Sequence, residues 1–561
     1  METKDPKYSQ KEKEASNSDL ERGGVLEDDQ PIPYTGIVDE KEYGHVRRGL
    51  KSRHVQFIAI GGIIGTGLFV GSGAALVRAG PLSIFLAYSI VGTVIYSLML
   101  AIGEMTTWLP IPGGLTIYAH RYLDSSFGFA MGWNYTIGAA LTICAEVSAA
   151  ITLIEFWTTD KPKAAWVALI IGVIFLLNIW VVEGYGEAEF IFASVKIITI
   201  IGLLILAVVL FFGGGPTHDR LGFRYWKNPG AMNEYLVPGA RGRFCGFLSS
   251  FVNACFAFSG SEVICVAASE TLNPRRNIPK AVRRTFWRVL IFYVFGVFAI
   301  GVLVPYNDKG LTTALKEGKS GAAASPWVAA IVNAGIEVLP HIINAVILTS
   351  AWSCGNSFMF AASRNLYALA ITGNAPKIFA RCSRRGIPIY AVVAVFLTSM
   401  LSFMCISTNS ATVFQWFMNV TTLSSLFNWV VLFLATIRFR KACLAQGIRT
   451  EDLPFHSVFM PYAAYYGLVM VSFFILISGF DVFFDFNART FVADYVGILI
   501  FAVPFIGHKA YTLFVTKESW GMVPPAEIDI TTGKAEVDEY ERLHPPEEPR
   551  NSLERIWFAI A

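Results

Sequence analysis

The sequence predicts an all-α protein that crosses a membrane about twelve times, and two observations support this prediction. The first is composition: 54% of the 561 residues are hydrophobic and 16% are charged, whereas an ordinary soluble domain carries about 25% charged residues. The second is the grouping of the apolar residues into runs of 18 or more, a length that spans a bilayer as a helix.

The expected spans lie between two polar tails. We place the tails at residues 1–50 and 516–561 and the membrane domain at residues 51–515. Spans 1–5 and 6–10 have comparable lengths, which indicates an inverted five-plus-five repeat with two helices appended. The expected spans are 54–77, 81–108, 127–157, 164–183, 188–212, 244–268, 286–305, 326–350, 387–407, 411–437, 461–480 and 491–515.

Basic residues gather in the loops on one side of the expected membrane domain. An even number of spans places both tails on the same side, together with the loops that contain Arg275, Arg364 and Arg438. Because cytoplasmic loops carry an excess of Lys and Arg, we expect both tails to be cytoplasmic. The Gly- and Pro-rich loop 213–243 is then expected to be an irregular outer cap.

Glycine-rich breaks recur in the first and the sixth expected span. Residues 58–69 read Ile-Ala-Ile-Gly-Gly-Ile-Ile-Gly-Thr-Gly-Leu-Phe, and residues 256–262 read Phe-Ala-Phe-Ser-Gly-Ser-Glu. In lipid every backbone polar group needs a partner, so a helix breaks only beside protein or a watery cavity. Breaks at matching places in two halves therefore indicate a substrate site at the bilayer midplane. Close helix packing through glycine is the alternative reading of the first cluster.

The chemistry of the two breaks predicts a zwitterionic ligand. Backbone N–H groups at the start of a half-helix, together with the hydroxyl of Thr66, suit a carboxylate. Freed carbonyls near Ile63 and around Phe256, Ala257 and Ser259 suit an ammonium group. A cavity that offers both ends is expected to bind an amino acid. Phe256 is also a candidate aromatic gate, with simple packing as the alternative.

Four ionisable residues inside the expected spans are candidates for proton coupling: Glu104, Glu146, Lys196 and Glu262. Each costs about 2.5–3.5 kcal/mol at the centre of an inserting helix, so we expect them to face the interior of the bundle. Burial moves such groups toward titration near physiological pH, which suits a proton carrier. The alternative is a fixed ion pair or hydrogen bond between helices, and we favour it for Glu104, which lies near the inner end of its span.

Motifs for other kinds of site are absent from the sequence. The eight cysteines form no CxxC pair, and no HExxH, GxSxG or Walker motif occurs. The first glycine cluster lacks the GxGxxG of a dinucleotide-binding loop. The net charge of +3, without a basic run, gives no sign of nucleic-acid binding. We therefore expect a protein that is not an enzyme, has no metal or cofactor, and uses the proton as its coupling ion.

At these residues the chain resembles the fungal amino-acid permeases of the amino acid–polyamine–organocation superfamily. The resemblance covers nearly all of residues 45–545, and residues 338–352 and 527–533 are similar to permeases for proline and small neutral amino acids. The motifs that carry the resemblance are Gly62-Ile-Ile-Gly65-Thr-Gly67-Leu-Phe69, Gly103-Glu104-Met105, Pro110-Ile-Pro-Gly-Gly114, Phe258-Ser-Gly-Ser-Glu262 and Asn273-Pro-Arg-Arg-Asn277-Ile-Pro-Lys280.

The resemblance implies a LeuT-like fold with discontinuous helices 1 and 6, and proton-coupled uptake by alternating access at the plasma membrane. It implies that Thr66 and Gly67 hold the substrate carboxylate. The residues that it implies for the ammonium group or the pocket wall are Ile63, Phe256, Ala257 and Ser259.

Two further positions take their roles from the resemblance. In bacterial relatives a lysine in the fifth span stands where sodium binds in sodium-coupled relatives, and Lys196 matches that lysine. Three residues before the aromatic gate, the proline permeases of filamentous fungi have a lysine, whereas this chain has Asn253. This departure makes Asn253 a candidate for substrate specificity.

We therefore expect a proton-coupled symporter that imports proline or other small neutral amino acids. The alternatives are a broad-specificity permease and a non-transporting amino-acid sensor on the same scaffold, although such sensors carry a much longer N-terminal extension. The expected partners are the amino acid, membrane lipid and ubiquitin ligase machinery. The last partner rests on lysines of the N-terminal tail, for which a merely solvated tail is the alternative: Lys4, Lys7, Lys11 and Lys13.

Overall fold

Helices make up the regular structure of the protein. The computed structural model describes residues 57, 64–111, 113–158, 162–179, 182–268, 271, 273–316, 325–517 and 520–543, and it contains no strand within these ranges. Among the described residues, ten helices are long and apolar enough to cross a membrane, and two shorter apolar helices, Gly67–Ala79 and Lys163–Ile179, accompany them. The count of twelve spans stays a prediction, because residues 54–56 and 58–63 of the first expected span lie outside these ranges.

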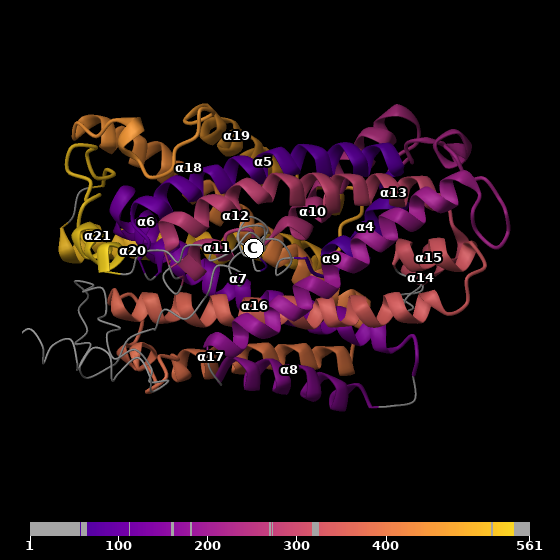
Figure 1. Cartoon of the computed structure of the whole chain (residues 1–561), viewed down its shortest axis with the longest axis horizontal. Coiled ribbons are helices and arrows are strands. Elements are labelled where there is room, and N and C mark those ends of the chain that lie inside the picture. Colours follow the sequence, from indigo (N-terminus) through magenta and orange to yellow (C-terminus); the bar gives the residue numbers. More distant parts are fainter. Residues whose placement is uncertain are drawn as a thin grey trace, which may run out of the picture.

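Most of the long helices run along the longest axis of the molecule (Figure 1). The predicted span 81–108 coincides with α5 (Pro81–Trp108). The other long helices are α7 (Ser125–Ile154), α9 (Val182–Phe212), α16 (Leu339–Ile371), α18 (Ser410–Ala445), α19 (Tyr462–Ile477), α20 (Ala488–Tyr511) and α17 (Ile389–Ser399), which η8 (Met400–Ile406) continues. The shorter helix Lys163–Ile179 is α8.

Two further long helices are interrupted or distorted. One consists of α10 (Gly239–Phe258) and α11 (Val263–Ala267), and the other of α12 (Pro274–Arg288), η5 (Val289–Val294) and α13 (Phe295–Leu303). The short helices are η2 (Gly67–Gly71), α4 (Ser72–Ala79), α6 (Gly114–Tyr122), η3 (Trp226–Gly230), α14 (Lys309–Lys316), α15 (Pro326–Asn333), η7 (Lys377–Ala380), η8 (Met400–Ile406), η9 (Thr450–Asp452), η10 (Phe480–Phe483), η11 (Thr512–Thr516) and α21 (Lys534–Leu543).

Apolar side chains cover much of the outer surface of the helix bundle. Ile198, Leu476 and Val503 are 70%, 80% and 62% exposed. Soluble proteins rarely expose contiguous apolar patches of large size, whereas lipid solvates such side chains at no cost. The exposed faces of α9, α19 and α20 are therefore suited to contact with lipid.

Helix α7 lies at the centre of the bundle and packs against α16, α18, α20 and α6. Small residues allow this close packing: a methyl group at Gly132 would overlap Leu369 of α16, and one at Gly138 would overlap Ser424 of α18. Asn134 of α7 adds a hydrogen bond of 2.9 Å from its Nδ2 to the backbone oxygen of Ser424. Small and amide-bearing residues are the usual means of packing helices in membranes.

The predicted span 326–350 is wrong. Residues Pro326–Asn333 form the short helix α15, and the long helix runs from Leu339 to Ile371. Arg364, which we expected in a loop, lies within α16 and is buried, with its guanidinium carbon 4.3 Å from the centre of the Phe360 ring. This cation–π contact compensates part of the cost of burying the charge. A hydropathy average does not include this contact, so the predicted span ended too early, at residue 350.

Other basic residues expected in loops also belong to helices. Helix α12 begins at Pro274, well before the predicted start at residue 286, and it contains Arg275. Helix α18 continues to Ala445 and contains Arg438. Basic side chains can extend from a helix end toward water, so a helix need not stop at the first charge.

The loop 213–243 lies at one end of the molecule, opposite α21 (Figure 1). It is irregular up to the start of α10 at Gly239, apart from the single turn η3. Backbone hydrogen bonds of 2.9 Å from Asn233 to Ala79 and from Leu82 to Ala231 attach it to the turn between α4 and α5. The loop therefore closes this end of the bundle.

A buried ion pair joins α5 to α18 near the opposite end. Arg440 donates from Nε and Nη2 to the two carboxylate oxygens of Glu104, at 2.8 and 2.6 Å. The backbone N–H of Ser457 donates to the same carboxylate at 2.9 Å, and the Glu104 side chain is fully buried. These contacts agree with the alternative that Glu104 forms a fixed ion pair between helices, because its carboxylate joins α5, α18 and the loop at Ser457.

Replacement of Glu104 by Gln is expected to destabilise the protein by about 3–5 kcal/mol, since it leaves a buried guanidinium without its counter-charge. Thermal unfolding of the detergent-solubilised protein would measure the loss. Lys441→Ala, at an exposed position one residue beyond Arg440, is the control and should change little. Equal melting temperatures for Glu104→Gln and Lys441→Ala would contradict this account of the pair.

Candidate functional site

Helix α10 ends at Phe258, and α11 begins four residues after Ser259. Ser259 has an extended backbone (φ −58°, ψ 145°) and Gly260 a positive φ of 88°, which glycine adopts without strain. The backbone N–H of Ser259 donates to the oxygen of Phe256 at 3.0 Å, and the Ser261 hydroxyl donates to the oxygen of Phe258 at 2.9 Å. The break that the sequence predicts at these residues is thus made without unpaired carbonyls at Phe256 and Phe258.

The first glycine cluster is described from Ile64 onward, so Ile63 and its predicted role lie outside the described residues. Ile64 and Gly65 are not helical, and η2 begins at Gly67. The hydroxyl of Ser350 in α16 donates to the oxygen of Ile64 at 2.8 Å. The chain therefore enters η2 through an irregular segment, and Ser350 of the neighbouring helix α16 binds the buried carbonyl of Ile64.

The two irregular segments approach each other closely. A Cβ atom at Gly67 would lie 2.8 Å from Cα of Ala257 and 3.0 Å from Cδ1 of Phe256. The obstructing atom of Ala257 is backbone and cannot rotate away. Glycine at position 67 is therefore required for the contact between η2 and α10.

A small pocket lies between these segments. The space open to the centre of a water molecule is about 10 Å³, which is room for about one water molecule. An amino acid enters only if the walls separate. The lining residues include four that the sequence analysis named for the substrate, together with Glu146: Gly65, Gly67, Thr142, Glu146, Phe256, Ala257, Ser259, Cys354 and Phe358.

The carboxylate of Glu146 accepts a hydrogen bond from the backbone N–H of Thr66. The nitrogen lies 3.4 Å from Oε1 and 3.3 Å from Oε2. A Cβ atom at Gly65 would lie only 2.5 Å from Oε1, so glycine at that position leaves room for the carboxylate. The hydroxyl of Thr66 is buried and makes no hydrogen bond within the described part of the chain. The backbone N–H of Thr66, in the segment predicted to bind a substrate carboxylate, thus donates to the carboxylate of Glu146 instead.

Two further charged groups lie behind the pocket. Lys196 of α9 is fully buried, and its charge acts on the carboxylates of both Glu146 and Glu189. The hydroxyl of Ser353 in α16 lies 2.9 Å from each carboxylate oxygen of Glu189. Cys354, the next residue, lines the pocket beside Glu146. The structure therefore brings Glu146 and Lys196 into one buried charge cluster.

The sequence analysis missed Glu189 as a member of this cluster. Glu189 lies seven residues before Lys196, which places both on the same face of α9. That spacing was the available signal. The wall residues Thr142, Cys354 and Phe358 carry no such signal, because their place at the pocket depends on the rotation of α7 and α16 in the packed bundle.

Glu262 and Asn253 do not line the pocket. Oε2 of Glu262 accepts a hydrogen bond of 3.1 Å from Nε1 of Trp429 in α18. Nδ2 of Asn253 donates at 2.9 Å to the backbone oxygen of Gly71, the last residue of η2. In this conformation both side chains attach the broken helices to their neighbours. Glu104 also lies apart from the pocket, in its ion pair with Arg440.

Phe256 forms one wall of the pocket and is 5% exposed. Its ring meets that of Phe414 in α18 edge-to-face, with 5.8 Å between the centroids. An aromatic ring in this position separates the pocket from α18. Its contact with a second ring provides a defined orientation.

The chain is similar to known proteins along most of its length. The family model described as amino acid permease matches residues 54–519. The chain is 46% identical to a proline-specific permease of Emericella nidulans, over 93% of this chain and 94% of that protein. It is 46% identical to a probable proline-specific permease of Schizosaccharomyces pombe, over 96% and 98% of the two chains.

A proline-specific permease of Saccharomyces cerevisiae is 43% identical, over 96% of this chain and 86% of that protein. These relatives match along nearly their full lengths, and the family model spans the whole membrane region from the first glycine cluster to the end of α20. The chain is thus a multi-pass membrane protein that belongs to the amino acid permease family.

Proposed function

We propose that the protein imports proline, or another small neutral amino acid, together with protons, by alternating access at the plasma membrane. The relatives named for proline support this substrate. The mechanism rests on one observation, the hydrogen bond from the Thr66 N–H to the Glu146 carboxylate. In this proposal the fold is LeuT-like with twelve spans, and both tails are cytoplasmic.

The hydrogen bond suggests how a proton and a substrate are coupled. A substrate carboxylate that uses the N–H of Thr66 has to displace the carboxylate of Glu146. Two carboxylates at one donor repel each other, so the substrate binds best when Glu146 is protonated. A neutral carboxyl group is also a weaker acceptor than a carboxylate and releases the N–H more readily. Proton binding at Glu146 and substrate binding at Thr66 thus favour each other.

The neighbouring charges give the proton a route of exchange. In the proposal Lys196, whose charge acts on both Glu146 and Glu189, takes part together with Glu189 in passing the proton to the other side. Glu262 is a second proton candidate, away from the pocket. Since the pocket has room for about one water molecule, binding of proline requires η2 and α10 to separate. Movement of the broken helices about a fixed scaffold accomplishes this in alternating access.

Uptake of labelled proline in a yeast strain deficient in amino-acid permeases tests the proposal. We expect uptake to be faster at acidic than at neutral external pH, to be abolished by a protonophore, and to be blocked by alanine or glycine. Competition mainly by arginine or glutamate would keep the mechanism but show a different specificity, whereas competition by neutral and charged amino acids alike would favour a broad-specificity permease. Failure to take up any amino acid, with the protein at the cell surface, would contradict transport and favour a sensor.

Replacement of Glu146 by Gln, which mimics the protonated acid, is expected to uncouple transport. The variant should still exchange proline for proline across the membrane but should not accumulate it, and its uptake should lose its dependence on external pH. The matched control is Glu155→Gln, at the end of the same helix, where the carboxylate pairs with Lys163 at 2.7 Å. Acid-stimulated accumulation by the Glu146→Gln variant would refute the assigned role.

Replacement of Gly67 by Ala is expected to lower proline uptake at least tenfold, about 1.4 kcal/mol, because the added Cβ meets the backbone of Ala257. Gly172→Ala is the control, since a Cβ at Gly172 in α8 meets nothing within 4 Å. Uptake is normalised to protein at the cell surface. Normal uptake by the Gly67→Ala variant would show that the two segments do not form the substrate site.

A further inference from the structure

The segment that follows the last long helix returns to the bundle and packs against it. We call residues 523–543 the tail segment; it ends in α21 and lies at the end of the molecule opposite loop 213–243 (Figure 1). Three of its apolar side chains are buried: Ile528 is 2% exposed, and Ile530 and Val537 are fully buried. Burial of this kind distinguishes a docked segment from a solvated one.

The first half of the tail segment is attached to α6 and α18. Nη1 of Arg121 in α6 donates to the backbone oxygen of Thr532 at 2.9 Å and lies 3.4 Å from Asp529. Nε2 of Gln446, at the end of α18, donates to the backbone oxygen of Ile528 at 2.7 Å. These contacts fix the tail segment to helices that pack on the central helix α7.

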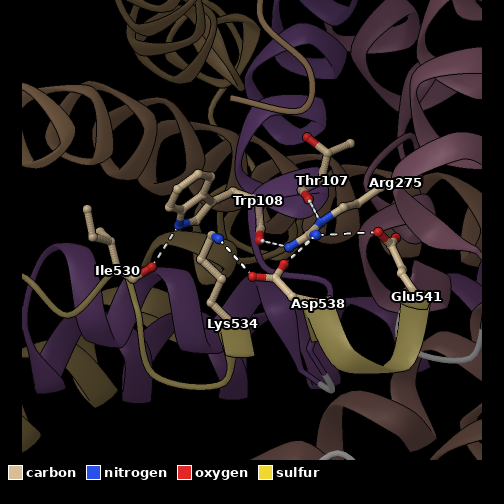
Figure 2. A network of polar contacts seen from close by, with 7 residues as sticks. All are labelled: Thr107, Trp108, Arg275, Ile530, Lys534, Asp538 and Glu541. Atoms are coloured by element: carbon tan, nitrogen blue, oxygen red, sulfur yellow. Dashed lines mark hydrogen bonds and ion pairs between the residues drawn. The ribbon is translucent and has the colours of Figure 1, made fainter. Parts of the chain in front are cut away.

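The second half is attached to the ends of α5 and α12 through one arginine (Figure 2). Nη1 of Arg275 lies 2.5 Å from Asp538 and 3.3 Å from Glu541, both in α21. Its Nε and Nη2 donate to the backbone oxygens of Thr107 and Trp108, at 3.1 and 3.4 Å. Arg275 therefore joins α12, α5 and the tail segment in a single cluster.

Trp108 and Lys534 complete this cluster (Figure 2). Nε1 of Trp108 donates to the backbone oxygen of Ile530 at 2.7 Å. Nζ of Lys534 lies 4.9 Å from the Trp108 ring and 2.9 Å from Asp538. The tail segment thus spans from α6 and α18 on one side to α5 and α12 on the other.

The position of Arg275 in the chain gives this attachment a consequence for transport. Helix α11 is the half of the broken helix that lies beyond the pocket, and it is followed within a few residues by Asn273 and α12. Asn273 has a positive φ of 48°, a turn in the connection between the two helices. Holding Arg275 in place therefore limits how far α11 can move away from α5.

We propose that the tail segment is a latch: by joining Arg275 to α6 and α18, it holds α11 against the bundle and keeps the pocket closed on the tail side. This inference rests on the proposed alternating access, in which α11 moves outward to release the substrate on that side. Release of the latch then precedes or accompanies opening.

The charge of Asp538 in the latch persists through the physiological pH range. Burial opposes ionisation, but hydrogen bonds from Lys534 and Arg275 outweigh it and lower the pKa of Asp538. A group whose pKa is lowered by docking contributes stability above its undocked pKa and loses it only as pH falls through the docked value. The latch is therefore held at neutral and mildly acidic pH, and a change of internal pH near neutrality does not release it.

The accessibility of the Cys265 thiol in α11 to a labelling reagent measures opening of the latch, and this measurement does not require transport. Cys265 is a free cysteine, 1% exposed, and lies 3.4 Å from the Thr106 hydroxyl of α5. The test uses the full chain in membrane vesicles of both orientations and a membrane-impermeant maleimide, with labelling of each cysteine measured by mass spectrometry. We expect Cys265 in the double variant Asp538→Asn/Glu541→Gln to be labelled at least about fivefold faster than in the wild type, from the tail side only.

Glu539→Gln is the matched control, since among the described residues Glu539 pairs with Arg542 of the same helix α21, at 2.6 Å. It should label at the wild-type rate, and so should Cys144 of the central helix in every variant. Equal labelling of Cys265 in the double variant and the wild type would overturn the latch. Parallel increases at Cys265 and Cys144 would also overturn it, because they indicate general loosening.

A charge-exchange pair of variants keeps the test valid if the double variant Asp538→Asn/Glu541→Gln does not fold. Arg275→Glu should accelerate labelling of Cys265, and its combination with Asp538→Arg should return the rate toward that of the wild type. Absence of this rescue would contradict the pairing. Uptake of labelled proline is measured in parallel. Absence of uptake by the wild type would refute the proposed function. The labelling rates of Cys265 test the latch separately, because labelling does not require transport.

Discussion

The requirement that every backbone polar group near the membrane centre has a partner shapes the site and its surroundings. Where the chain is irregular before η2, the backbone groups of Ile64 and Thr66 have Ser350 of α16 and Glu146 of α7 as partners. Where it leaves the helix after Phe258, the partner is Ser261 within the turn. The first break is therefore stabilised by side chains of neighbouring helices, and the second by a side chain of its own turn.

This requirement also explains why a charge lies at the pocket. The N–H of Thr66 needs an acceptor in the absence of substrate, and a carboxylate meets the need at the cost of burying a charge. Lys196 lies close enough to offset part of that cost. An amino acid brings its own carboxylate, and the same N–H cannot serve both equally. In the proposed mechanism, competition for this one donor is the physical basis for coupling a proton to an amino acid.

The sequence predicted local features better than those that depend on packing. The apolar run of α5 and the break at Ser259 and Gly260 follow from composition and from glycine chemistry, and the structure has them where expected. The span at 326–350 was wrong, because the charge of Arg364 is accommodated by a ring that no hydropathy average includes. The pocket wall at Cys354 became visible only when α16 and α7 were placed together, whereas the spacing of Glu189 and Lys196 along α9 was a signal that the sequence analysis missed.

The account depends most on where a bound amino acid places its carboxylate. A structure of the protein with bound proline at acidic pH, at a resolution that defines side chains, tests it directly. The account predicts the proline carboxylate within hydrogen-bond distance of the Thr66 N–H, with the Glu146 side chain moved off that donor and the pocket enlarged. Proline bound elsewhere, with Glu146 still on the Thr66 N–H, would contradict it.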